Sequence, residues 1–152
     1  MNPLDRLTNL PALFFFFLFF GIILYLAYIR NMETKRILKR FPDKNKILLT
    51  AFGVTFFGQE SEIEKPLRVN GALVLLREGV FFRSRFGNRE IFISKESIKN
   101  LGVSDFFKDK PMYQNLVAVT FLSPKGQIDR AAFRIPYPDR WILAMRTELL
   151  NK

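Results

Sequence analysis

Residues 71–93 read GALVLLREGVFFRSRFGNREIFI, and this stretch decides the fold class of the chain. Three short runs that are apolar or alternate apolar with polar residues occupy positions 71–76, 80–85 and 89–93. The two connections between them each contain a glycine. Short runs joined by glycine-containing turns are typical of consecutive β-hairpins. The stretch therefore predicts an antiparallel meander of three strands.

The strand pattern continues on the C-terminal side of this meander. One turn at 94–98 leads into a predicted strand at 99–107, and the polar residues 108–114 are expected to form a loop. The runs 116–122 and 128–135 have the composition of two further strands. These segments extend the meander into a larger antiparallel sheet.

On the N-terminal side, two interpretations of the apolar run ILLTAFGVTFF at 47–57 stay open. It is either a strand of the domain or a connector that joins the domain to the preceding segment. The polar tract GQESEIEKP at 58–66 then reads as a solvated loop. Its three glutamates lack the spacing of a calcium-binding loop, so we expect no metal site there.

The chain changes period near its C-terminus. Pro138 and Asp139 are typical first-turn residues of a helix. The apolar residues that follow recur at helical spacing and share one face, namely Trp141, Ile142, Met145 and Leu149. We therefore predict an amphipathic helix over 140–150, with the tryptophan packed into the core.

Six or seven strands followed by one amphipathic helix predict an α+β domain that is mostly β. This order resembles that of bacterial pleckstrin-homology-like (PH-like) and GRAM-like domains. The similar segments are GALVLL at 71–76, GVFF at 79–82, REIFI at 89–93 and PDRW at 138–141.

A further segment, FFGQES at 56–61, resembles part of small single-pass bacterial membrane proteins of the same kind. The resemblance covers about residues 47–150 and implies a soluble domain over 47–152. It implies an antiparallel β-barrel or sandwich that is closed by the C-terminal helix. Its matched positions are core and turn residues, and no binding site of the family is carried over to this chain.

An uncharged run of 20 residues, LPALFFFFLFFGIILYLAYI at 10–29, precedes this domain. At about 1.5 Å per residue, such a helix spans the roughly 30 Å hydrocarbon core of a bilayer. The tail at 1–9 has little of the positive charge of a signal peptide, and no small-residue cleavage site follows the run. We therefore expect an uncleaved transmembrane helix over 10–29.

Basic residues lie mainly on one side of this helix. Only Arg6 precedes it, whereas seven basic residues follow within 30–46, RNMETKRILKRFPDKNK. Cytoplasmic flanks carry the excess of lysine and arginine. The asymmetry predicts a single-pass protein of the inner (plasma) membrane, with its N-terminus outside and its domain in the cytoplasm.

The basic juxtamembrane segment 30–46 has two interpretations. It is a topology signal, or its predicted helix over 34–40 also lies on anionic headgroups. In the second case, the residues that contact the membrane surface are Arg30, Lys35, Arg36, Lys39 and Arg40.

Three arginines, Arg83, Arg85 and Arg89, gather around the second turn of the meander. Side chains alternate in a strand, so Phe81 shares a face with the first two. If the opposite face is in the core, these residues form an outward basic stripe beside an exposed Phe81. Such a stripe can clamp a phosphate or carboxylate of a lipid or partner. A solubilising outer face that protects the sheet is the alternative.

Composition argues against catalysis. The chain has no cysteine and no histidine, which excludes a disulfide, a thiolate nucleophile and the commonest general base. It also lacks a glycine-rich phosphate loop and the G-x-S-x-G and H-E-x-x-H motifs. We expect no catalytic residue, no cofactor, no metal and no small-molecule substrate.

The net charge of +10 favours anionic partners. Half of it belongs to the juxtamembrane segment, where seven basic residues face two acidic ones. The sequence therefore predicts a non-catalytic PH-like interaction domain at the cytoplasmic membrane face, which binds a protein partner or an anionic lipid. A structural accessory subunit of a membrane complex is the alternative. Nucleic-acid binding is a third reading that we do not expect, because no motif for it is present.

Overall fold

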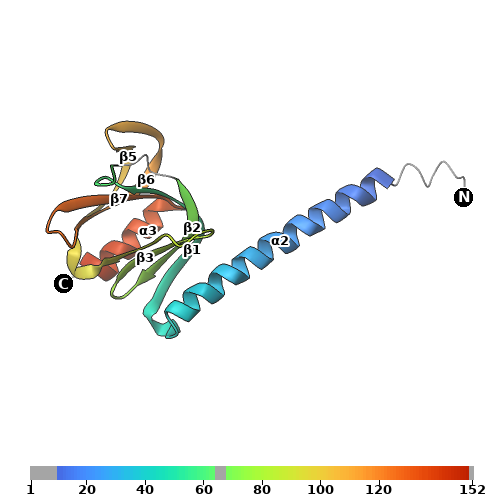
Figure 1. The fold of residues 1–152 in the computed structure, drawn as a ribbon, viewed down its shortest axis with the longest axis horizontal. Helices are drawn as coiled ribbons and strands as arrows, with labels where there is room; N and C mark the ends of the chain where they lie inside the picture. The colour runs from blue at the N-terminus through green and yellow to red at the C-terminus, as the bar shows by residue number, and fades with distance from the viewer. Residues whose placement is uncertain (1–9, 64–67, 151–152) are drawn as a thin grey trace, which may run out of the picture. The chain divides into compact units, whose positions relative to one another are not determined.

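The structure is a computed structural model that describes residues 10–63 and 68–150 (Figure 1). The chain divides into two compact units, Met1–Arg40 and Phe41–Lys152. The first unit contains helix α2 (Leu10–Arg40). This helix is long and apolar enough to cross a membrane by length and composition.

Helix α2 continues through the predicted boundary between the transmembrane helix and the juxtamembrane segment. Its 31 residues include the helix expected at 34–40 without a break. Neither glycine nor proline occurs between positions 30 and 40, so nothing interrupts the helical hydrogen bonds there. The chain leaves the helix at Phe41 and Pro42, where a proline cannot continue it.

The second unit is an antiparallel sheet, in which the described residues form seven strands (Figure 1). The strand order across the sheet is β4-β3-β2-β1-β7-β6-β5. The predicted meander is confirmed as three neighbouring strands of this sheet. The strands are β1 (Ile47–Gln59), β2 (Val69–Leu76), β3 (Gly79–Ser84), β4 (Glu90–Ser94), β5 (Ile98–Phe107), β6 (Lys110–Leu122) and β7 (Ile128–Arg134).

The apolar run 47–57 is a strand of the domain, and it lies at the centre of the sheet. Strand β1 pairs with β2 from Ile47 to Phe56 and with β7 from Thr55 to Gln59. Its register shifts next to Gly53 and Gly58, which have φ angles of 69° and 98°. Such bulges bend a strand. The central strand can therefore turn from one half of the sheet to the other.

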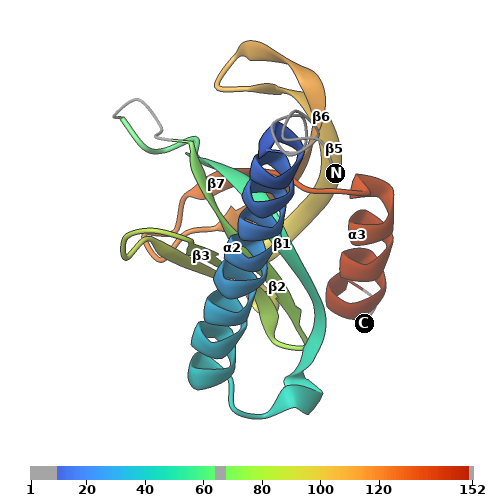
Figure 2. The ribbon, with the colours of Figure 1, turned by 90° about the vertical axis from the view of Figure 1, so that its right-hand side faces the viewer.

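The sheet does not close into the barrel that the sequence predicts. Within the described residues, β4 and β5 are the two edges, and no ladder joins them. Strand β4 has only five residues, and a 3-10 turn at Lys95–Ser97 directs the chain away from it. Helix α3 (Pro138–Met145) packs against β6 and the edge strand β5 (Figure 2). The helix covers the apolar surface of these two strands. A closed barrel would instead need β4 and β5 to pair with each other.

The main core lies on the inner face of the bent sheet. Phe56, Phe82 and Phe133 come from three strands, and their ring centroids lie 5.0–5.9 Å apart. The predicted helical face completes this core and is confirmed. Its residues are Trp141, Ile142, Met145 and Leu149, all of them buried. The last of them falls on Arg146–Leu150, which is wound as a π-helix.

The predicted loop at 108–114 is wrong, because β6 begins at Lys110. Only Lys108 and Asp109 form the turn, with φ angles of 52° and 57°. Phe106 pairs with Pro111, and the next pair joins residues 104 and 116, so four residues of β6 face one residue of β5. This wide bulge interrupts the alternation that identifies a strand in a sequence.

A second, smaller core lies on the outer face of the sheet. It contains Phe57 of β1, Phe107 of β5, Leu116 of β6 and Ala132 of β7, with Met112 packed against them. Adjacent residues of β1 therefore bury their rings on opposite faces of one strand, Phe56 inside and Phe57 outside. This apolarity of both faces explains why the run 47–57 shows no alternation.

Candidate functional site

The expectation of an exposed Phe81 is wrong. Its side chain is only 2% exposed, and its ring packs edge-on against Phe41 at 5.0 Å. Phe81 pairs across the ladder with Val74, which is also buried. The outer face of β2 and β3 is apolar at this point. A role of Phe81 in contact with a lipid or partner stays a prediction.

The arginines of the predicted stripe do not share one surface. Arg83 lies on the outer face of β3, and its Nη1 contacts Glu90 Oε1 at 3.0 Å across the ladder. Arg89 instead lies over the ring of Phe56, a core residue, with its guanidinium carbon 4.8 Å from the ring centroid. Arg85 follows Arg83 on the outer face, and its backbone N–H donates to the Asn70 carbonyl at 2.8 Å. Contact between these arginines and an anionic lipid or partner stays a prediction.

The tract at 58–66 that the sequence predicts as a solvated loop starts inside β1, which ends at Gln59. The next two residues are fixed on β7. The Glu60 carboxylate accepts a hydrogen bond from Arg130 Nε at 2.9 Å. Ser61 donates twice to Asp129, from its N–H at 3.1 Å and from its hydroxyl at 2.6 Å. Asp129 is buried, and its carboxylate holds the chain where it leaves β1. This part of the tract is therefore ordered by ionic and polar bonds.

The next residue, Glu62, joins two hairpin turns. Its carboxylate is ion-paired with Arg89 of the β3–β4 turn. Its carbonyl accepts a hydrogen bond from Lys108 Nζ of the β5–β6 turn at 2.6 Å. The third glutamate of the tract, Glu64, lies outside the described residues. Across residues 10–63 and 68–150, no group of three or more His, Cys, Asp or Glu side chains could hold a metal ion.

A row of polar side chains that the sequence pattern does not predict crosses the outer face of four strands. Thr55 of β1 is 5% exposed, and its hydroxyl donates to Asn70 Oδ1 of β2 at 2.9 Å. Arg134 of β7 donates from Nη2 to Thr55 Oγ1 at 3.2 Å and from Nη1 to Gln114 Oε1 of β6 at 3.5 Å. The only local signal is a polar residue inside an otherwise apolar run, such as Thr55 in 47–57.

A second arginine lies on the same face. The guanidinium carbon of Arg68 is 5.1 Å from the centroid of the Phe57 ring. Phe57 follows Thr55 by two residues, so both side chains leave β1 on the same side. Together with the polar row, this places two guanidinium groups along one short segment of the central strand.

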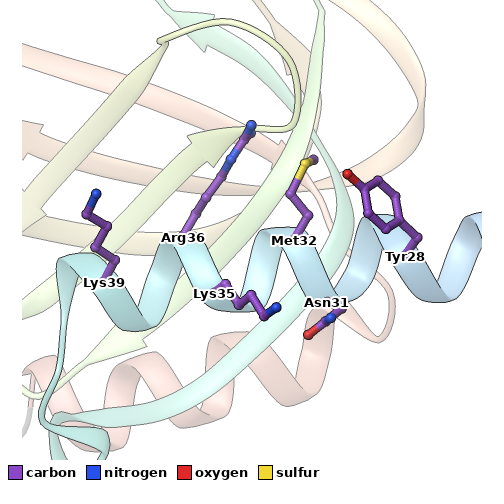
Figure 3. Close-up of a pocket in the computed structure, with 6 residues that line it drawn as sticks. All are labelled: Tyr28, Asn31, Met32, Lys35, Arg36 and Lys39. Atoms are coloured by element: carbon purple, nitrogen blue, oxygen red, sulfur yellow. The ribbon is translucent and has the colours of Figure 1, made fainter.

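Helix α2 carries the basic residues that the sequence predicts at the membrane surface. Figure 3 shows a pocket lined by six of its side chains. Tyr28, Met32, Arg36 and Lys39 extend on one side of the helix, as their spacing of three or four residues requires. Lys35 extends on another side of the helix. Contact between the basic side chains of α2 and lipid headgroups stays a prediction. These side chains are Arg30, Lys35, Arg36, Lys39 and Arg40.

Comparisons with known proteins define the fold. No family model and no curated protein match the sequence. The C-terminal domain of an unknown protein from Leishmania infantum is 18% identical, with a TM-score of 0.52 over 78% of this chain and 98% of that one. The Vps36 N-terminal PH domain is 12% identical, with a TM-score of 0.51 over 70% of this chain and 80% of that one.

A chain of the 8S snRNP assembly intermediate is 10% identical, with a TM-score of 0.50 over 70% of this chain and 81% of that one. At such identities the likeness shows the fold alone. The second unit is therefore PH-like, in agreement with the resemblance seen in the sequence. The narrower GRAM-like and bacterial resemblance stays a prediction.

Proposed function

We propose that this protein is a membrane-tethered PH-like interaction domain. Helix α2 anchors it at the cytoplasmic face of the inner (plasma) membrane, and the domain binds an anionic lipid or a protein partner without catalysing a reaction. The observation that carries the proposal is the direct succession of an apolar helix of membrane-spanning length and a PH-like sheet. Domains of this fold suit recognition of proteins and lipids.

The surface of α2 supports a bilayer as its environment. Its six phenylalanines are each 51–68% exposed. Apolar surface costs about 25 cal/mol per Å² when it contacts water, so a helix of this kind is stable only where lipid or protein covers it. The phenylalanines are Phe14, Phe15, Phe16, Phe17, Phe19 and Phe20.

Tethering changes what the domain must do to bind. A domain that is held in a thin layer at the membrane meets other membrane components at a high effective concentration, so weak contacts are sufficient. The alternative function is an accessory subunit of a membrane complex. It would place another helix against α2 near Gly21, where the missing side chain permits close approach.

Cysteine labelling in intact cells tests the tether and its orientation. The chain has no cysteine, so single variants Thr8→Cys and Lys125→Cys report two positions without background. A membrane-impermeant maleimide is expected to label position 8 in intact cells and position 125 only after permeabilisation. The protein should also stay in the membrane fraction at alkaline pH. The reverse labelling pattern would refute the orientation, and release into the soluble fraction would refute the tether.

A further inference from the structure

Five of the arginines that the structure describes in the domain form two groups by the charge of the groups that they contact. In one group, each guanidinium contacts a carboxylate: Arg83 contacts Glu90, Arg89 contacts Glu62 and Arg130 contacts Glu60. These ion pairs neutralise the positive charge locally.

In the other group, the partners among residues 10–63 and 68–150 are neutral. Arg134 donates to the Thr55 hydroxyl and the Gln114 amide oxygen, and Arg68 lies over the Phe57 ring. Hydroxyl, amide and ring partners orient a guanidinium but do not cancel its charge.

Both guanidinium groups converge on one side of β1. Thr55 and Phe57 leave the strand on its outer face, because Val54 and Phe56 on either side of Thr55 belong to the inner core. Two residues along a strand span about 6.6 Å. Arg68 precedes β2, and Arg134 ends β7. The two side chains therefore approach the same short segment of β1 from its two neighbours.

Asn70 adds a neutral donor at the same place. It pairs with Thr55 in the ladder, and its Oδ1 already accepts the Thr55 hydroxyl. An asparagine amide has one acceptor oxygen and two N–H donors, so its remaining capacity is mainly for donation. A guanidinium has five N–H donors, and the bonds that Arg134 makes to described residues use two of them.

We propose that this face binds a phosphate group between Arg68 and Arg134, with Asn70 Nδ2 as a third donor. Guanidinium groups recognise carboxylate and phosphate with paired hydrogen bonds. Donors that arrive from three side chains on two sides of a strand suit a tetrahedral anion with several oxygens better than a planar carboxylate. The inference rests on the proposed function, because it supplies the anionic ligand of the interaction domain. The phosphate is that of a lipid headgroup or of a soluble phosphate compound.

Nuclear magnetic resonance of the full-length protein in neutral maltoside micelles tests the site. Inorganic phosphate and pyrophosphate are titrated at constant ionic strength while the Asn70 side-chain amide and the Thr55 backbone N–H are observed. Saturable shifts are expected, with acetate at least tenfold weaker. Arg68→Gln with Arg134→Gln should weaken phosphate binding about a hundredfold, at about tenfold for each charge-assisted contact.

The matched control removes the same charge elsewhere. Arg77→Gln with Arg140→Gln changes two exposed arginines on the β2–β3 turn and on α3, and binding should stay within about twofold. Equal weakening in both double variants would overturn the proposal, because only overall charge would then matter. If the first double variant does not fold, Arg134→Lys serves instead. Lysine keeps the charge but lacks the planar fork, so binding about tenfold weaker supports the site and unchanged binding overturns it.

Nanodiscs distinguish the two sources of phosphate. Full-length protein is placed in phosphatidylcholine discs with added phosphatidic acid or added phosphatidylserine. A shift of Asn70 with phosphatidic acid identifies a lipid headgroup, and a shift with soluble phosphate alone identifies a soluble compound. No shift with either overturns the site. Phosphate binding in micelles does not depend on membrane orientation, so the site and the proposed tether can fail separately.

Discussion

Substitution of Gly71 by alanine should destabilise the domain strongly. A Cβ atom at this position would lie 2.0 Å from the carbonyl oxygen of Arg83 and 2.9 Å from Phe82 Cζ. The nearest obstacle is backbone of the neighbouring strand, which cannot move aside as a flexible side chain can. Strands β2 and β3 must therefore separate at this point, close to the 2.8 Å bond from the Arg85 N–H to the Asn70 carbonyl.

The expected loss has two parts. Overpacking of a tight site costs about 1–3 kcal/mol. Weakening of an adjacent backbone hydrogen bond adds about 1 kcal/mol. Gly71→Ala should therefore lower the free energy of unfolding by about 2–4 kcal/mol, which is a large share of the roughly 5–15 kcal/mol that is typical of a domain.

Gly102→Ala is the matched control, because a Cβ atom added at position 102 would meet nothing within 4 Å. Removal of a strand glycine reduces the entropy of the unfolded chain, so this variant should be neutral or more stable by up to about 1 kcal/mol. Denaturant unfolding of full-length protein in maltoside micelles, followed by fluorescence of the single tryptophan, Trp141, measures both variants. Trp141 is buried in the core and reports its exposure on unfolding. A loss below about 1 kcal/mol for Gly71→Ala, or equal effects of both variants, would refute the reasoning.

Three further predictions concern the core, the β1–β2 connection and the hairpin. Phe133→Ala should cost about 3–5 kcal/mol in the same unfolding assay, because its ring is fully buried; a cost below about 1.5 kcal/mol would contradict the packing. Asp129→Ala should cost about 1–3 kcal/mol and speed proteolysis after Glu62, because Ser61 loses both bonds to the carboxylate; unchanged cleavage would refute its anchoring role. A protein partner that binds the hairpin should be lost when Arg83, Arg85 and Arg89 are all replaced by alanine. The assay is affinity capture from mild-detergent extracts of native membranes, where a stoichiometric partner is expected with the unchanged protein. Retention of the partner by the variant would place the contact elsewhere.

Local patterns identified the elements whose signals lie within short windows. The uncharged run at 10–29 predicts a long apolar helix, and α2 contains it. Glycine-separated runs in 71–93 predict the meander, and the helical spacing from Trp141 to Leu149 predicts a buried face that the structure confirms. Each of these depends on residues that lie close together in the chain, which one helix or consecutive hairpins bring together.

The same local reasoning failed where burial or register depends on other strands. Strand alternation places Phe81 on the outer face, but only its neighbours determine that this face is apolar and buried. The wide bulge in β6 erased the alternation at 108–114, so the start of that strand was missed. Closure of the sheet likewise depends on how its edges meet and on where α3 packs, and no single segment encodes either.

The sequence by itself therefore determined an apolar helix of membrane-spanning length, a mostly β domain with a C-terminal helix, and a basic chain without the residues of common catalytic centres. Only the tertiary structure decided which arginines are neutralised and which converge on a common face. Thr55 lies 15 residues from Asn70 and 79 residues from Arg134, and strand pairing brings both within hydrogen-bond distance of the Thr55 hydroxyl. Contacts of this kind arise from the register of distant strands, which the fold as a whole sets. A polar residue in an apolar run, such as Thr55, marks the position in the sequence but does not identify its partners.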